Sequence, residues 1–135
     1  MKKLAIAIAG VLAGGVAHAD NLEGVEEMIC AAAQVQVCIE NDTCYLASPD
    51  DLDMPDFVVI DIDKKTISTT RASNENRSTP FSSVSKSDGL IYLQGVEGGR
   101  AFSFVIDEAT GRMTVAVSRD GLSVSVFGAC TDTDI

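Results

Sequence analysis

The sequence predicts an all-β domain, a single antiparallel sheet of about eight strands closed into an up-and-down barrel, with a two-sheet sandwich as the alternative. From Phe57 onward the apolar pattern has a period of two rather than 3.6, as in strands that bury one face. Short turns rich in Gly and Asp separate these segments, so we expect sequence neighbours to pair as hairpins. An even number of cysteines, four, predicts two disulfides in a small β protein.

The amino-terminal stretch, residues 1–19, predicts a secretory signal peptide. Lys2 and Lys3 form a positive start, and an apolar run follows. Ala19 ends a small-x-small cleavage site, so we expect the mature chain to begin at Asp20. The apolar run, about 13 residues, is too short for a stable membrane anchor. The positive start resembles bacterial signals, so we expect a periplasmic protein, with full secretion as the alternative.

The mature chain, residues 20–135, is expected to form one strongly acidic domain. Cleavage removes Lys2 and Lys3 but no acidic residue, which leaves 8 basic residues against 20 acidic ones, a net charge of −12. Such a surface repels nucleic acid and anionic membranes. We therefore expect no nucleic-acid binding and no membrane anchor after signal removal. A basic protein or a small ligand is the partner that this charge allows.

The segment that follows the signal is ambiguous between helix and strand. An alanine run at residues 31–33 is compatible with a helix, whereas residues 35–37 (V-Q-V) alternate like a strand. We favour a strand over about residues 28–39, and helix or strand stays open for residues 22–33. Residues 47–56 hold two prolines and four aspartates, a composition typical of a long surface connection.

Seven further segments complete the expected sheet. Each is a short run with β-branched or alternating apolar residues, bounded by turn residues such as Ser-Asp-Gly or Glu-Gly-Gly. Pro80 marks a strand start or a sheet edge, because proline cannot donate to the ladder. The expected strands cover residues 57–63, 66–72, 79–86, 90–96, 100–107, 112–118 and 122–130.

The last three strands alternate cleanly, which predicts the side chains that face the interior. In an antiparallel sheet with one buried face, every second residue points inward. The residues expected to point inward are Phe102, Phe104, Ile106, Met113, Val115, Val117, Leu122, Val124 and Val126.

The cysteines allow three connectivities, of which we favour one. Cys38–Cys44 would close a short loop, and Cys30–Cys130 would join the first and last segments, stapling the barrel seam. The alternation places the two cysteines of the second pair on opposite faces of the sheet. Cys130 is in phase with inward apolar residues, whereas Cys30 is in phase with glutamines, which are expected to point outward. A bulge near Gly128 would restore the phase.

The chemistry available to the mature chain is narrow. Signal cleavage removes His18, which is the only histidine. Ser-His-Asp triads, Cys-His dyads and histidine metal sites are therefore excluded, and we expect no enzyme, no catalytic residue and no cofactor. Ser83-x-x-Lys86 has the spacing of Ser–Lys catalysis, but it lies on an expected strand, whereas such enzymes use a helix.

Two groups of aspartates remain as candidates for chemistry. Asp61 and Asp63 lie two apart on one expected strand and so project from the same face; they are the pair to test for a carboxylate-dependent hydrolase. The four aspartates of residues 50–56 offer oxygen ligands for calcium, but they lack the EF-hand order. We interpret both groups as solvated carboxylates.

Several segments resemble a known group of proteins. Residues 99–103 (G-R-A-F-S), 110–114 (T-G-R-M-T) and 127–131 (F-G-A-C-T) look like those of small exported proteobacterial proteins of unassigned function. That group shares a signal peptide, an early group of cysteines and a terminal Phe-Gly-x-Cys. The resemblance covers most of the mature chain and implies no catalytic residue.

At the level of architecture, the chain resembles the periplasmic inhibitors of C-type lysozyme. Those proteins are small disulfide-linked barrels of eight strands that engage a basic enzyme, and an acidic chain fits that role. Their Ser-Gly-x-Gly inhibitory loop is not found in this sequence. The resemblance therefore implies a binding function but no inhibitory residue.

Taken with the missing histidine, these features predict an exported, non-enzymatic binding protein for a protein or small ligand. Inhibition of a basic enzyme is one version of this hypothesis. The alternatives are a small carboxylate-dependent hydrolase and a structural component of the envelope.

Overall fold

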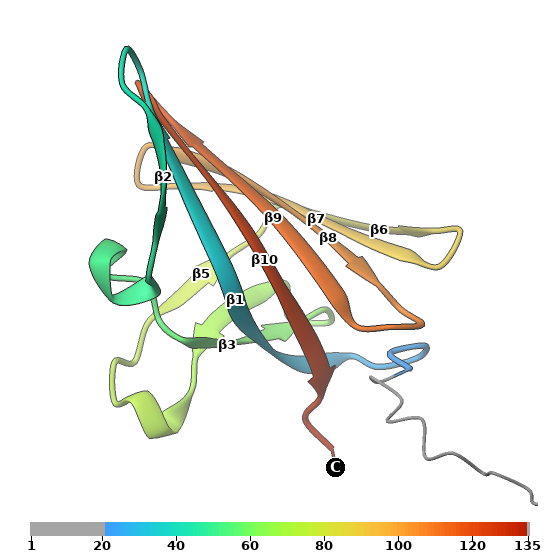
Figure 1. Ribbon diagram of the computed structural model, residues 1–135. Coiled ribbons are helices and arrows are strands. Elements are labelled where there is room, and N and C mark those ends of the chain that lie inside the picture. The colour runs from blue at the N-terminus through green and yellow to red at the C-terminus, as the bar shows by residue number, and fades with distance from the viewer. Residues whose placement is uncertain (1–20, 135) are drawn as a thin grey trace, which may run out of the picture.

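The computed structural model describes residues 21–134, in which one antiparallel sheet of ten strands curls into a half-barrel (Figure 1). The expected signal peptide and its cleavage site at Ala19 and Asp20 lie outside the described residues. Within these residues no helix is long and apolar enough to cross a membrane. The strands are β1 (Glu27–Ile39), β2 (Cys44–Ala47), β3 (Phe57–Asp61), β4 (Thr66–Thr69), β5 (Ser78–Pro80), β6 (Ser83–Ser87), β7 (Leu90–Glu97), β8 (Arg100–Asp107), β9 (Arg112–Arg119) and β10 (Leu122–Asp132).

The strand order is β5-β4-β3-β1-β10-β9-β8-β7-β6, with β2 as a second neighbour of β1. The first strand therefore lies beside the last, as the sequence predicts. The other edge of β1 is shared, because β3 pairs with its first half and β2 with its second half. In Figure 1 the long strands form one wall, and the shorter β3 to β5 bend across below it.

The two outermost strands, β5 and β6, are consecutive in sequence and are joined by Phe81 and Ser82 alone. The Phe81 N–H donates to the carbonyl of Lys65 at the β3–β4 turn, over 3.0 Å. The Ser82 N–H donates to the carbonyl of Gln94 in β7, over 2.8 Å. The chain thus crosses from one end of the sheet to the other in two residues and fixes that corner of the half-barrel.

The count of ten strands exceeds the expected eight for two reasons. The segment 79–86 is two strands, because Phe81 turns its ring into the core, where it is 4% exposed, and interrupts the pairing. The short strand β2 was not expected, since its four residues are mostly exposed and show no alternation of burial. Residues 27–39 form a strand, which settles the ambiguity between helix and strand for that part of the chain.

Residues 47–56 connect β2 to β3 and carry the single-turn 3-10 helix η1 (Pro49–Leu52). A capping box starts it, in which the Ser48 hydroxyl accepts from the Asp51 N–H and the Asp51 carboxylate accepts from the Ser48 N–H. The side chains of Leu52 and Met54 pack against the core. The connection therefore covers part of the sheet as well as bridging two strands. A second such turn, η2 (Arg71–Ser73), follows β4.

A bulge in β1 brings the cysteines of the seam into phase. Ala32 pairs with Gly128, and Gln34 pairs with Phe127, the neighbour of Gly128 in sequence. Ala33 is therefore an extra residue of β1 with no partner in β10. The bulge was expected near Gly128; it lies in β1, directly across from that glycine. Because one extra residue reverses the alternation, Cys30 and Val35 both face inward despite their opposite parity.

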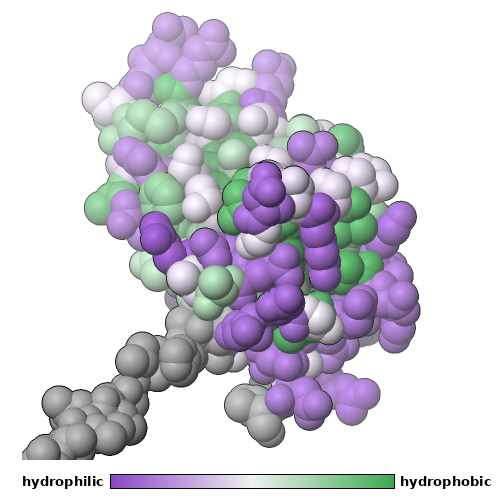
Figure 2. Space-filling model, turned by 90° about the vertical axis from the view of Figure 1, so that its right-hand side faces the viewer, coloured by the Kyte–Doolittle hydropathy of each residue, from purple (hydrophilic) through white to green (hydrophobic). Residues whose placement is uncertain are grey.

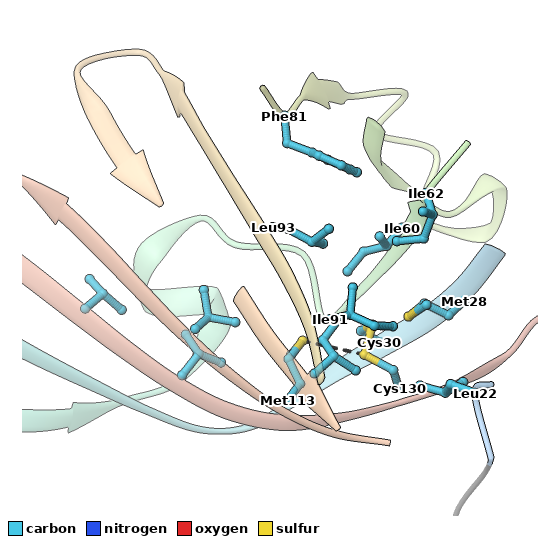
Figure 3. Close-up of a cluster of buried hydrophobic side chains, with 14 of the residues drawn as sticks. Leu22, Met28, Cys30, Ile60, Ile62, Phe81, Ile91, Leu93, Met113 and Cys130 are labelled. Carbon is cyan, nitrogen blue, oxygen red and sulfur yellow. Dashed lines mark hydrogen bonds between the residues drawn. A yellow bond between two sulfur atoms is a disulfide. The ribbon is translucent and has the colours of Figure 1, made fainter. Parts of the chain in front are cut away.

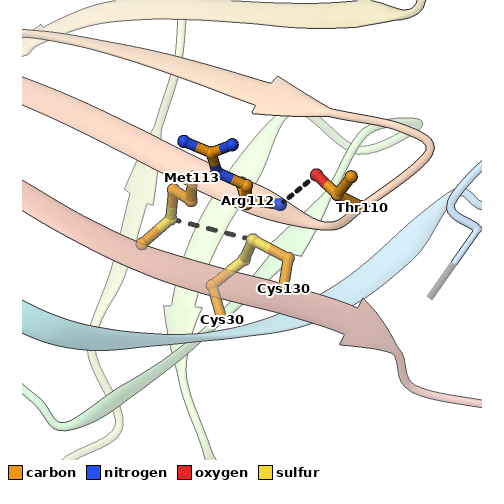
Figure 4. Close-up of a disulfide and its surroundings, with 5 residues drawn as sticks. All are labelled: Cys30, Thr110, Arg112, Met113 and Cys130. Atoms are coloured by element: carbon orange, nitrogen blue, oxygen red, sulfur yellow. Dashed lines mark hydrogen bonds between the residues drawn. A yellow bond between two sulfur atoms is a disulfide. The ribbon is translucent and has the colours of Figure 1, made fainter. Parts of the chain in front are cut away.

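Both expected disulfides are confirmed. Cys30–Cys130 links directly opposed residues of β1 and β10, with a sequence separation of 100. Cys38–Cys44 links β1 to β2 and closes a short loop, with a sequence separation of six. Figure 4 shows the first disulfide beneath β9, where Met113 Sδ lies 3.7 Å from Cys130 Sγ. Sulfur atoms from three strands therefore meet in the interior.

The core fills one end of the half-barrel, where β3 to β5 cover the long strands. Figure 3 shows these side chains converging from β1, β3, β7 and β9 and from the segments on either side of them. Leu22, ahead of the first strand, is fully buried there, and its N–H donates to the carbonyl of Glu108. The fully buried side chains of this end include Leu22, Met28, Ile60, Ile91, Leu93 and Ile106.

Candidate ligand-binding cavity

Strands β3 to β5 form a short arm that covers the concave face of the long strands. The arm is shorter than that face, and the difference in length leaves a cavity. Strands β7 to β9 have eight residues each, whereas β3, β4 and β5 have five, four and three. The short arm covers the end of the long strands that holds the core. Beyond it, the interior is hollowed into an open cavity of about 190 Å³.

The walls of this cavity are apolar and come from both sides of the half-barrel. One wall is the inward face of β8 and β9, with Phe102, Phe104 and Val117. The facing wall comes from Val58 and Ile67 of the short arm, together with Met54 ahead of β3. The alternation of β8 and β9 predicts these inward side chains correctly. All of them keep partial exposure, which shows that the folded chain does not fill its own interior.

Gly95 and Phe102 shape one wall of the cavity. They are direct cross-strand partners in β7 and β8, and a β carbon on Gly95 would overlap the tip of the Phe102 ring. The ring therefore lies against the bare glycine backbone, close to the sheet. It meets Phe104 edge-on, with ring centroids 5.9 Å apart and planes at 83°. The missing side chain at Gly95 thus gives the ring a place outside the cavity.

Four charged residues form the rim of the cavity. Arg77, just ahead of β5, and Arg100, at the start of β8, line it from opposite walls, together with Asp56 and Glu97. All four side chains are exposed. The Arg77 Nη1 donates to the carbonyl oxygen of Asp53 over 3.3 Å, which fixes that guanidinium at the opening. The site therefore combines an apolar interior with a polar entrance, as small-molecule sites commonly do.

The outer surface also carries both hydrophilic and apolar side chains. On the face drawn in Figure 2, hydrophilic side chains cover much of the lower part, and apolar side chains are exposed between and above them. Several large apolar residues are exposed in the structure, among them Leu46 at 69%, Phe57 at 51% and Phe127 at 46%. These three lie on the convex face by register, opposite Gln36, Ala31 and Gln34.

The aspartates considered for catalysis do not form the expected pair. β3 ends at Asp61, and Asp63 lies in the turn that follows, so the two are not on one strand. The expectation that one strand carries both aspartates is therefore wrong. The Asp61 carboxylate instead accepts from the Lys64 N–H over 2.9 Å and stabilises the turn. Its role in the structure is local and explains its place at the strand end.

The serine and lysine of the Ser83-x-x-Lys86 pattern lie on opposite faces of β6. Ser83 pairs with Gln94 on the convex face, whereas Lys86 pairs with Ile91, a core residue. A hydroxyl and an amine that project to opposite sides of a sheet cannot exchange a proton directly. The structure does not bring these two residues together.

The acidic connection before β3 is built as a turn. Asp51 is engaged in the capping box, and Asp53 adopts a left-handed conformation at the end of η1. Asp50 and Asp56 are exposed. Among residues 21–134, no group of three or more His, Cys, Asp or Glu side chains is placed to hold a metal ion.

The cavity and the two arginines at its opening were not predicted from the sequence. The residue in the sequence that could have indicated the cavity is Gly95. It occupies an inward position of an alternating strand, and Phe102 lies opposite it across the turn that contains Gly98 and Gly99. Gly98 and Gly99 both have positive φ, at 59° and 77°, and they set this register. An inward glycine opposite a phenylalanine marks a place where a β carbon is excluded.

No family model matches this chain, and neither a curated protein nor a solved structure shows significant similarity to it.

Proposed function

We propose that this chain is an exported, non-enzymatic binding protein whose concave cavity holds a small apolar ligand. The observation that carries the proposal is the open apolar interior, in which Phe102, Phe104 and Val117 point inward yet stay partly exposed. A folded chain gains free energy by covering such surface, at about 25 cal/mol per Å². A ligand that covers these side chains would gain the free energy of burying apolar surface that the folded chain leaves exposed.

The size of the cavity supports a small ligand. Its 190 Å³ exceeds the roughly 150 Å³ of an engineered apolar cavity that binds benzene or xenon. It is below the range of about 300–1,000 Å³ that is typical of sites for drug-sized molecules. One aromatic ring or a short aliphatic chain fits this space.

The test is a titration of the mature, disulfide-bonded protein with benzene, followed by NMR of the methyl groups. We expect shift changes at Val115 and Val117, which line the cavity. Val117→Phe fills the cavity and should abolish them. Ala116→Phe, next to it in sequence but on the convex face, is the matched control and should leave binding intact. If benzene shifts no cavity methyl in the wild type, the cavity is not a binding site.

A second candidate function, binding of a basic protein, is supported by a separate observation. Residues 40–56 contain six exposed carboxylates and no lysine or arginine. Such a one-sign surface steers a cationic partner toward it. Lysozymes are suitable probes, because they are basic. Binding at micromolar concentration that is lost in the triple variant Asp50→Asn, Asp53→Asn, Asp56→Asn would support this function; absence of binding would remove it.

A further inference from the structure

We infer that the ligand of the cavity is a short amphiphile, an apolar tail with an anionic head group that the rim arginines hold. This inference rests on the proposed function and names the class of ligand. Its first basis is position: Arg77 and Arg100 come from opposite walls and line the same opening. An apolar tail inside the cavity would place its polar end between them.

The second basis is the charge of the surroundings. The chain carries 20 acidic residues against 10 basic ones. Two arginines on one small opening therefore stand out against an acidic molecule. Asp56 and Glu97 also line it, so the lining itself is balanced. Glu97 is the direct cross-strand partner of Arg100 at the β7–β8 hairpin.

A third arginine lies beside Arg100 on the neighbouring strand, outside the lining of the cavity. Arg119 in β9 is the direct partner of Arg100 in β8, and both side chains are exposed. Like charges directly opposite each other on adjacent strands destabilise a sheet. An anion beside this pair would relieve the repulsion, and guanidinium groups bind carboxylates with two parallel hydrogen bonds. Phe102 and Val117 are also direct partners. They lie two residues along β8 and β9 from Arg100 and Arg119, and so on the same face of the sheet.

The cavity volume sets the length of the tail. The cavity, at about 190 Å³, is somewhat larger than the roughly 150 Å³ engineered cavity that holds benzene. A tail of roughly six to eight carbon atoms matches this space. The chemistry therefore points to a medium-chain carboxylate, for which octanoate is the probe.

The experiment is calorimetric titration of the mature, disulfide-bonded protein with octanoate and with octan-1-ol. The two probes share a tail and differ in charge. We expect octanoate to bind about tenfold more tightly at low salt, and this advantage should shrink as salt screens the arginines. Affinity for carboxylates should rise about fourfold for each added methylene and level off at roughly eight carbons, when the cavity is full.

The arginine variants complete the test. Arg77→Gln and Arg100→Gln should each weaken octanoate binding about fivefold, the value of one exposed ion pair, and leave octanol binding unchanged. Arg112→Gln is the matched control, because Arg112 is an exposed arginine of β9 whose neighbour Met113 is the one that faces inward.

Two other outcomes overturn distinct claims. Equal affinity for octanol and octanoate would overturn the head-group inference and leave the apolar site standing. Failure of both probes to bind, with benzene also inert, would overturn the proposed function and the inference with it.

Discussion

Gly128 and Ala31 approach so closely that a β carbon on Gly128 would overlap the carbonyl oxygen of Ala31. The contact lies at the bulge of β1, where the seam between the first and last strands changes phase. The glycine is needed here for space and not for its backbone freedom. The fit of the two strands therefore depends on a missing side chain.

Gly128→Ala is expected to destabilise the protein by about 1–3 kcal/mol, the usual cost of forcing an extra carbon into a packed site. Urea unfolding monitored by circular dichroism measures the change. Ser125→Ala, on the same strand and exposed, is the control and should shift stability by less than about 0.5 kcal/mol. Equal stability of Gly128→Ala and the wild type would contradict the close approach.

Gly95→Ala should reduce ligand binding without unfolding the protein. The added methyl group pushes the Phe102 ring away from the sheet, and the ring then occupies cavity volume. Benzene or octanoate affinity measures the loss. The double variant Gly95→Ala, Phe102→Leu should recover binding, because the smaller side chain vacates that space. Loss of binding that Phe102→Leu does not repair would argue against the ring as the cause.

The two disulfides should differ in their contribution to stability. In the chain-entropy description, a crosslink over 100 residues stabilises by about 4–5 kcal/mol, and one over six residues by roughly 2 kcal/mol. Replacing Cys30 and Cys130 by alanine should therefore lower the free energy of unfolding more than replacing Cys38 and Cys44. Denaturant titration of both double variants decides the order, and a reversed order would contradict this account.

Leu22→Ala should destabilise the protein by about 2–5 kcal/mol, since this side chain is fully buried at the core end of the half-barrel. Thermal unfolding measures the change. Glu23→Ala, next in sequence and exposed, serves as the control and should have little effect. A small effect of Leu22→Ala would mean that the segment ahead of β1 contributes little to the folded state.

Alternation along the strands predicted the all-β class, the inward faces of β8 to β10 and the pairing of the first strand with the last. Both disulfides followed from spacing and from this pairing. The parity conflict between Cys30 and Cys130 even indicated a bulge. Its strand was harder to predict, because a single extra residue on either strand restores the phase equally well.

The cavity was beyond the reach of periodicity. Alternation gives the face on which Phe102 and Phe104 lie, but their exposure depends on how far the opposite wall extends. That extent follows from the turn of Phe81 into the core, which splits one expected strand into β5 and β6. Arg77 and Arg100 meet at one rim only because the curled sheet brings distant segments together, and no local pattern records that.

The Cys30–Cys130 bond also changes the covalent topology of the molecule. It turns residues 30–130 into a closed ring. A protease that cuts one exposed loop of this ring opens it without dividing it, and both new ends stay attached to the same folded sheet. A single nick in this ring therefore leaves one covalently continuous molecule.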